Sequence, residues 1–388
     1  MLIGGMLSSL SVYTSAMQPH FGWSEAAMGG GPVMLLMGMS AGNLLVGPMM
    51  TRLGAGGPLR FGTALALGGW IVAGLVRTLP EFMAAMGCAG LGVGAATIVP
   101  GIALISNGFH QQRGLAIALF IGSCALASSV MPAANQWLIE QLGWRQGFWT
   151  FGALAGPICF GALWALPSGA AAQGSTTVEE GEVPGFAREQ ALRLPAFWIL
   201  TIVLTVSQLC LNAILFNLIA YLRKSGWDAA DAVTLFSITN FMSLPGLLIG
   251  GHLSDRVSAR ILLPLILILQ GAGTFALLGV GSGAVIPAIV FILCWGGVAG
   301  LPAQTGSMLL GEITGHRAYP ALLGIVFTIN GFAGALAPVI MGWVYQAAGG
   351  YAAPLLICAC LCVSAALASL LCSNERRKLT AIPGQENA

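Results

Sequence analysis

Charge is what this sequence has least of. Only 7% of its 388 residues are charged, whereas 57% are hydrophobic. A soluble domain carries roughly 25% Asp, Glu, Lys and Arg, so a chain this poor in charge is not built to be solvated by water. The few basic residues never gather on one face, and the net charge is only +2, which excludes nucleic acid as a partner. The composition predicts an all-α polytopic membrane protein with the lipid bilayer around it.

Constellations for catalysis or metal binding are also missing. The nine cysteines lie inside apolar runs without any CxxC spacing, and a thiol in such a run behaves as a small hydrophobe. The four histidines lie at loop edges, and no GxxxxGK[ST] loop is present to bind ATP. We therefore expect no enzyme activity, no cofactor and no metal, with a gradient as the energy source.

Twelve apolar runs are long enough to cross a bilayer, which needs roughly 20 residues at 1.5 Å per residue. They lie near residues 1–18, 30–51, 58–76, 82–106, 114–137, 146–167, 195–222, 232–251, 261–279, 284–310, 320–345 and 351–373.

The one long polar stretch between runs divides the chain into six spans plus six. We expect an N-terminal six-helix bundle at 1–167, a central loop at 168–193, a C-terminal six-helix bundle at 194–373 and a tail at 374–388. Eleven of the fifteen Lys and Arg residues fall on one side of this arrangement, and Arg77, Arg145, Arg223 and Lys224 fall on the other. Since cytoplasmic loops are rich in Lys and Arg, this bias places the central loop and the C-terminus in the cytoplasm.

The two halves are copies of each other. A shift of 204 residues superposes Gly22-Trp23 on Gly226-Trp227, Arg52 on Arg256, and Arg113 on Arg317. Parallel six-span repeats related by an axis along the membrane normal place a binding site between them near mid-bilayer and suit rocking-type alternating access. The same shift makes span 1 short: either the helix is truncated, or the start codon lies upstream of Met1.

The loop after span 8 has a recognisable signature. The stretch GGHLSDRVSAR places Gly251, Asp255, Arg256 and Arg260 in the spacing G-x3-D-R-x3-R, which resembles the loop signature of the major facilitator superfamily. Its N-terminal counterpart, GPMMTRLGAGG, keeps Gly47 and Arg52 but has Thr51 in place of the acid.

Several shorter stretches resemble the oxalate/formate antiporter and monocarboxylate transporter branch of that superfamily. They are FGWS at 21–24, RGLA at 113–116, GWR at 143–145, AFW at 196–198 and the span-11 run at 315–342. The resemblance implies small organic anions as substrates and a bacterial-type inner membrane as the location. Members of this branch typically carry an arginine in span 8, and some carry a lysine in span 11, yet no charged residue occurs at 232–251 or 321–346 here.

Neutral polar residues are therefore the best candidates for substrate contacts. Gln208 and Asn212 are four residues apart in span 7, and Ser237 and Asn240 are three apart in span 8, so each pair shares a helix face. The alternative is that they bond neighbouring helices, at about 0.6 kcal/mol per bond. Weaker candidates lie near the middle of other spans: Tyr13, Trp295, Gln304 and Asn330.

A proton is the candidate co-transported ion, but no acid lies deep in a span. A weak acid could cross with its own proton, or Asp228, Asp231 or Glu312 could titrate at a span end. Otherwise the protein is a facilitator, or its substrate is neutral.

The signature loop has a mechanical interpretation as a gate. Asp255 ends span 8, where a carboxylate can pair with arginines and cap the N-terminus of a neighbouring helix. Such contacts would hold the cytoplasmic side shut. The expected gating residues of the two copies are Gly251, Asp255, Arg256, Arg260, Gly47 and Arg52.

Three functions compete. The first is a secondary or facilitative transporter of a small organic solute, a monocarboxylate or another organic acid. The second is an exporter of drugs or metabolites, although span 4 lacks the arginine and span 5 the GPxxGG run that drug/proton antiporters of the superfamily carry. The third is a membrane receptor that keeps the fold without transporting anything.

Overall fold

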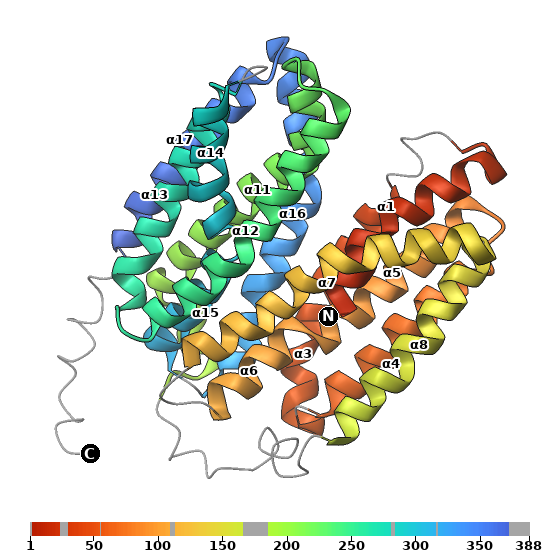
Figure 1. The fold of residues 1–388 in the computed structure, drawn as a ribbon. Helices are drawn as coiled ribbons and strands as arrows, with labels where there is room; N and C mark the ends of the chain where they lie inside the picture. The colour runs from red at the N-terminus through yellow and green to blue at the C-terminus, as the bar shows by residue number, and fades with distance from the viewer. Residues whose placement is uncertain are drawn as a thin grey trace. The chain divides into compact units, whose positions relative to one another are not determined.

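The computed structural model describes residues 2–23, 30–54, 56–108, 113–165, 185–280, 284–315 and 317–371. These residues are almost wholly helical (Figure 1). Within them the only β-type pairing is an isolated bridge between Gly185 and Gly315. Most of the expected central loop, at 168–184, and the expected tail at 374–388 lie outside the described residues.

The described residues of the first half form seven helical segments. They are α1 (Leu2–Phe21), α3 (Gly30–Leu53), α4 (Gly56–Ala73), α5 (Leu79–Ala96), α6 (Ile98–Gly108), α7 (Arg113–Leu142) and α8 (Trp144–Ala165). The second half repeats this order after a short helix. Its segments are α10 (Arg188–Leu192), α11 (Pro195–Lys224), α12 (Ala229–Ser254), α13 (Ala259–Leu277), α14 (Val285–Cys294), η1 (Gly296–Val298), α15 (Leu301–Thr314), α16 (Tyr319–Ala348) and α17 (Ala352–Leu371).

These segments make up the twelve predicted spans in the described part of the chain. Nine spans are long and apolar enough to cross a membrane by length and composition, with α5 and α6 forming one of them and α14, η1 and α15 another. Helices α1, α4 and α8, of 20, 18 and 22 residues, lie at the remaining three. The fold is an all-α polytopic membrane fold, as the composition predicted.

Two spans that the sequence predicted as single runs are interrupted. Helix α5 ends at Ala96 and η1 ends at Val298, and a proline follows four residues after each, Pro100 and Pro302. Proline has no N–H to donate to the carbonyl four residues earlier, and its ring clashes with that carbonyl, so the helix breaks there. With the 204-residue shift, Val298 corresponds to residue 94, so both breaks fall at nearly the same place in the repeat.

The described chain divides into two compact units. The first consists of Met1–His110, Leu119–Glu182 and Pro320–Ala335, and the second of Gln111–Ala118, Val183–Tyr319 and Leu336–Ala388. The start of α7 thus groups with the second unit, and most of the first half of α16 groups with the first. Each unit has its own aromatic-rich core, one around Tyr13, Trp70 and Phe148 and the other around Phe291 and Trp295.

Helix packing in the first unit depends on small residues in α5. A Cβ added at Gly90 would overlap the carbonyl oxygen of Leu35, and one at Gly94 would overlap that of Met39, both in α3. Since lipid is as apolar as a leucine side chain, helices in a membrane gain from such close backbone approach rather than from hydrophobic burial. Glycine at these two positions therefore allows α5 and α3 to pack closely.

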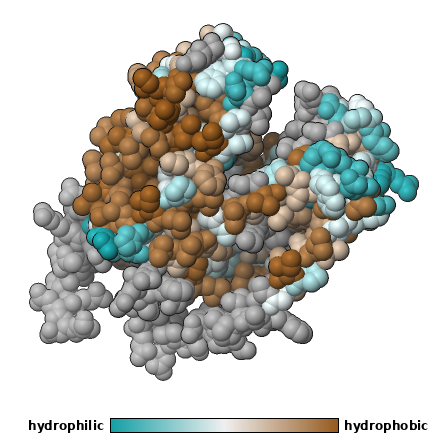
Figure 2. Space-filling model, viewed as in Figure 1, coloured by the Kyte–Doolittle hydropathy of each residue, from teal (hydrophilic) through white to brown (hydrophobic). Residues whose placement is uncertain are grey.

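The surface agrees with a bilayer as solvent. Large apolar side chains are exposed along the helices, for example Ile261 at 67%, Ile286 at 77% and Leu367 at 63%. Figure 2 shows apolar residues covering the side of the α13, α14 and α17 group, while hydrophilic residues gather toward helix ends. The same residues would be a liability in water.

Candidate functional site

The end of α12 holds the start of α7 through one carboxylate. Asp255 Oδ1 accepts a hydrogen bond from the backbone N–H of Gly114 at 2.7 Å, and Oδ2 accepts one from Leu115 at 3.1 Å. Both donors lie in the first turn of α7, where backbone N–H groups have no partner within the helix and the helix dipole is positive. The helix cap expected for Asp255 is therefore present, and its role in gating stays a prediction.

Glycine makes this junction possible. A Cβ at Gly114 would lie 2.6 Å from the carbonyl oxygen of Gly251 and 2.8 Å from Asp255 Oδ1, so any side chain there would displace the cap. Gln304 of α15 joins the same junction, because its Nε2 donates to the carbonyl oxygen of Gly114 at 3.0 Å. The structure thus places Gln304, a predicted substrate contact, beside the end of α12 and the start of α7. Its buried Oε1 has no hydrogen-bond partner among the described residues.

The basic residues of the signature lie further out. Arg256 is exposed, and Arg260 forms an ion pair with Glu312 of α15, with 3.5 Å between Nε and Oε2. In the N-terminal copy, Arg52 is exposed and Gly47 is buried. A Cβ at Gly47 would lie 2.8 Å from the Cα of Ala321, so α3 approaches the start of α16 closely at this point.

The predicted substrate residues of α11 form a linked pair. Gln208 Nε2 donates to Asn212 Oδ1 at 3.3 Å, as expected for residues one turn apart. Asn212 is 8% exposed and Gln208 is half-buried. Neither side chain has a hydrogen bond to another helix in the described part of the chain. The alternative that these two residues bond neighbouring helices therefore gains no support.

The α12 pair lies on a helix that packs against the break in span 10. Ser237 is exposed, and Asn240 is half-buried with its Nδ2 donating to its own helix at the carbonyl oxygen of Phe236, 2.9 Å away. Between them, the backbone oxygen of Thr239 would lie 2.8 Å from a Cβ at Gly296, the first residue of η1. Helix α12 thus packs against the interrupted backbone of span 10 through Thr239, which lies about 100° around the helix from Asn240.

Interrupted helices are a feature that reasoning from the sequence missed. Discontinuous spans at matching positions of two repeats are where membrane transporters expose backbone groups and helix ends to substrates. The signals were present in the sequence as Gly296-Gly297 followed by Pro302 in span 10, and as Pro100 in span 4. Buried polar atoms near the span-10 break, Trp295 Nε1 and Thr305 Oγ1, have no hydrogen-bond partner among the described residues.

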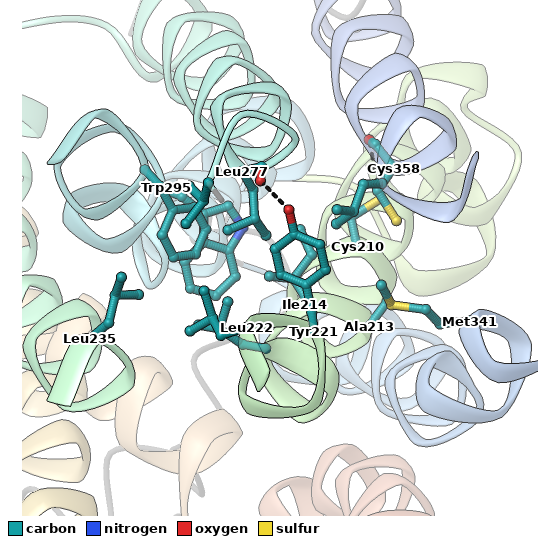
Figure 3. Close-up of a cluster of buried hydrophobic side chains, with 14 of the residues drawn as sticks. Cys210, Ala213, Ile214, Tyr221, Leu222, Leu235, Leu277, Trp295, Met341 and Cys358 are labelled. Atoms are coloured by element: carbon teal, nitrogen blue, oxygen red, sulfur yellow. Dashed lines mark hydrogen bonds between the residues drawn. The ribbon is translucent and has the colours of Figure 1, made fainter. Parts of the chain in front are cut away.

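The three remaining predicted contacts, Trp295, Asn330 and Tyr13, are buried. Trp295 is 2% exposed, stacks on Phe291 with ring centroids 5.3 Å apart, and lies in the cluster with Leu222 and Leu235 (Figure 3). Asn330 of α16 is 6% exposed.

Tyr13 is fully buried and belongs to a polar network that the sequence did not reveal. Its hydroxyl donates to Asn135 Oδ1 at 2.8 Å, and Asn135 Nδ2 donates to Ser9 Oγ at 2.8 Å. The network joins α1 to α7, and Tyr13 also stacks on Phe148 of α8 at 4.0 Å. In this structure Tyr13 and Trp295 act as packing residues.

Comparison with known proteins gives one consistent family. The family model described as Major Facilitator Superfamily matches residues 1–318. Monocarboxylate transporter 13 from Bos taurus is 24% identical over 311 residues, which cover 80% of this chain and 71% of that protein. The oxalate:formate antiporter of Oxalobacter formigenes is 25% identical over 354 residues, which cover 88% of this chain and 83% of the antiporter.

Solved structures agree on the fold. The E. coli fucose:proton symporter superposes with a TM-score of 0.74 at 16% identity and covers 96% of this chain and 97% of its own. A proton:xylose symporter bound to a deoxyglucose derivative also has a TM-score of 0.74 at 16% identity, and covers 94% and 92% of the two chains.

Proposed function

Because this chain belongs to the Major Facilitator Superfamily, we propose that it transports a small organic acid, a monocarboxylate in the first instance, across a membrane by alternating access. One observation carries the substrate class: relatives named for monocarboxylates and for oxalate and formate align with four fifths or more of the chain. The absence of charged residues from spans 8 and 11 limits the proposal to modes of binding that need no ion pair inside the membrane.

Neutral groups supply the substrate contacts in this proposal. The side-chain amides of Gln208, Asn212 and Asn240 can donate hydrogen bonds to carboxyl oxygens. Moving a bare carboxylate past such groups is costly, since an ion loses its hydration there. A weak acid that crosses with its own proton avoids this cost, so we propose that transport of the acid and of a proton are linked in this way.

The Asp255 cap provides the gate. While the carboxylate holds the first turn of α7, that end of the protein is closed, and it opens when the two hydrogen bonds break. We place this end, with the central loop and C-terminus, on the cytoplasmic side of a bacterial-type inner membrane, because eleven of fifteen basic residues lie there. Labelling a cysteine introduced at Ser225 from outside intact cells, in a variant without the native cysteines, tests this orientation.

Uptake into proteoliposomes tests the function. Labelled formate, lactate, pyruvate and oxalate should enter liposomes that contain the purified protein, and uptake of the monocarboxylates should accelerate when the outside is acidic. A sugar and a cationic drug serve as controls that should not enter. If only the drug entered, the proposed transport of organic acids would be wrong and the protein would be a drug transporter. If no solute enters but a carboxylate stabilises the protein thermally, the protein is a receptor and not a transporter.

A further inference from the structure

A lysine at the end of α11 is held by aromatic rings instead of a carboxylate. Lys224 Nζ lies 2.6 Å from the hydroxyl oxygen of Tyr345 and donates to it, and Nζ lies 4.1 Å from the centroid of the same ring. The ring of Tyr351 is 5.6 Å from Nζ. These three residues belong to the second unit, and we refer to them as the Lys224 cluster.

The cluster is assembled by two turns that are distant in sequence. Helix α11 ends in a turn with Gly226 at φ 93°, and α16 ends in a turn with Gly349 at φ 70°, values that favour glycine. Tyr345 and Tyr351, on either side of the second turn, have ring centroids 4.5 Å apart. Burial raises the pKa of Tyr351 by more than the positive charge of Lys224 lowers it. The phenol of Tyr351 therefore stays neutral at physiological pH.

The positive charge of Lys224 has no acidic partner in the described part of the chain. No carboxylate there lies within 4.0 Å of its Nζ. The α11 C-terminus and the ring faces offset part of the charge. An ammonium group has three N–H donors, of which the Tyr345 oxygen takes one. Two donors of a well-positioned cation remain.

The hydroxyl of Tyr345 adds a further donor. Because its oxygen accepts from Lys224, its own O–H is free to point away from the ammonium, and a hydroxyl polarised by a cation donates more strongly. The lysine nitrogen and the phenol oxygen are 2.6 Å apart, so one N–H and one O–H can each donate to one oxygen of the same carboxylate. A neutral solute would gain little from this pair.

We propose that the Lys224 cluster is a carboxylate-binding site at the C-terminal ends of α11 and α16, where an organic anion binds before it enters the uncharged spans. This rests on the proposed function and deepens it, because it assigns recognition of charge to a span end. The cluster lies at the opposite end of α12 from Asp255, since α12 runs back from the α11–α12 turn. It is also at one end of the helix that carries Gln208 and Asn212.

Direct binding is measured first, on the full chain in nanodiscs. Sodium lactate should perturb the near-ultraviolet absorbance of tyrosine, whereas lactamide, its neutral analogue, should not. Lys224→Gln should weaken lactate binding about fivefold at low salt, and Tyr345→Phe, which keeps the ring, about threefold. Both effects should shrink in 0.5 M sodium chloride, because the screening length there is only about 4 Å.

Arg223→Gln is the matched control. Arg223 lies one residue earlier, is exposed, and has no ring or hydroxyl partner among the described residues, so its loss removes the same charge from the same helix end. Lactate affinity should be unchanged in this variant. Equal weakening in Arg223→Gln and Lys224→Gln would show general electrostatic attraction and overturn the proposal. So would a loss of thermal stability in Lys224→Gln and Tyr345→Phe with unchanged lactate affinity, which indicates a structural clamp.

Uptake separates this proposal from the proposed function. If the wild type takes up lactate with a half-saturation concentration that Lys224→Gln leaves unchanged, the site is overturned and the transporter stands. If the wild type binds lactate through Lys224 but takes up no acid, the site stands and the proposed transport function fails.

Discussion

The end of α12 and the end of α3 are two copies of one loop, and each contacts the start of a helix distant in sequence in a different way. At α12, the Asp255 carboxylate accepts two backbone hydrogen bonds from the start of α7. At α3, the equivalent residue is Thr51, and the contact recorded at this end is the close approach of Gly47 to Ala321 of α16. The α12 copy combines a charged cap with close packing, whereas the α3 copy has the close packing alone.

A second substitution accompanies the first. The shift of 204 residues matches Gly114, which leaves room for the Asp255 carboxylate, with Ala318. A methyl group at Gly114 would lie 2.8 Å from Asp255 Oδ1, so a capping acid and a glycine opposite it depend on each other. The N-terminal copy has neither. The signature is therefore a pair of positions in two helices and not one loop. The contact at Asp255 and its copy at Thr51 need not open with equal ease.

Removing the charge from the intact copy should have the largest effect. Asp255→Asn replaces two charge-assisted hydrogen bonds by weaker ones and should cost the closed state about 2 kcal/mol, roughly thirtyfold in the closed-to-open ratio. Hydrogen exchange at the first turn of α7 should accelerate accordingly, and uptake should slow because the cycle spends longer with this end open.

Two variants serve as controls for that result. Gly114→Ala should act in the same direction with Asp255 intact, because its methyl displaces the carboxylate. Thr51→Asn, at the equivalent position of the other copy, should leave exchange at α7 unchanged. If Asp255→Asn alters neither exchange nor uptake, the cap does not gate the protein.

The same comparison shows what a sequence can reveal. The twelve spans were predictable because a bilayer requires long apolar runs, and charges mark their ends. The Asp255 cap was predictable because the signature keeps its acid at a helix end, where only a few partners are possible. Local patterns of this kind carry their own physical constraints.

The particular partners of buried polar side chains were not predictable. Gln304 was predicted as a substrate contact from its depth in a span, but its amide reaches the carbonyl of Gly114, 190 residues away. Tyr13 was predicted as a weaker substrate contact from its depth in a span, and its hydrogen bond to Asn135, 122 residues away, could not be read from that depth. In both cases the side chain has several possible partners, and the packing of other helices selects one. The tyrosines around Lys224 are a third example, since Tyr345 is 121 residues from the lysine.

Rebuilding the degenerate copy is the next test, with a smaller expected effect. Thr51→Asp together with Ala318→Gly restores both missing features and should favour the closed state by about 1 kcal/mol, roughly fivefold. Hydrogen exchange at the first turn of α16 should slow, and so should turnover.

The interdependence of the two positions is measured by the single variants. Each alone should have less than half the effect of the pair, because the acid needs the space that the glycine provides. Strictly additive single effects would contradict the idea that the signature is a pair of positions.

The ion pair between Arg260 and Glu312 should matter least. It joins α13 to α15 at 3.5 Å, with side chains 23% and 36% exposed, and the N-terminal copy has Gly56 and Gly108 at these positions. An exposed pair of this kind contributes at most about 1 kcal/mol, because water and salt screen it. Arg260→Gln should therefore lower thermal stability slightly, leave exchange at the start of α7 unchanged, and keep uptake within about twofold of the wild type, similar to Arg256→Gln at an exposed position. A large loss of uptake in Arg260→Gln alone would mean that the gate depends on this arginine as well as on Asp255, and that the two copies differ by a whole charge network instead of one cap.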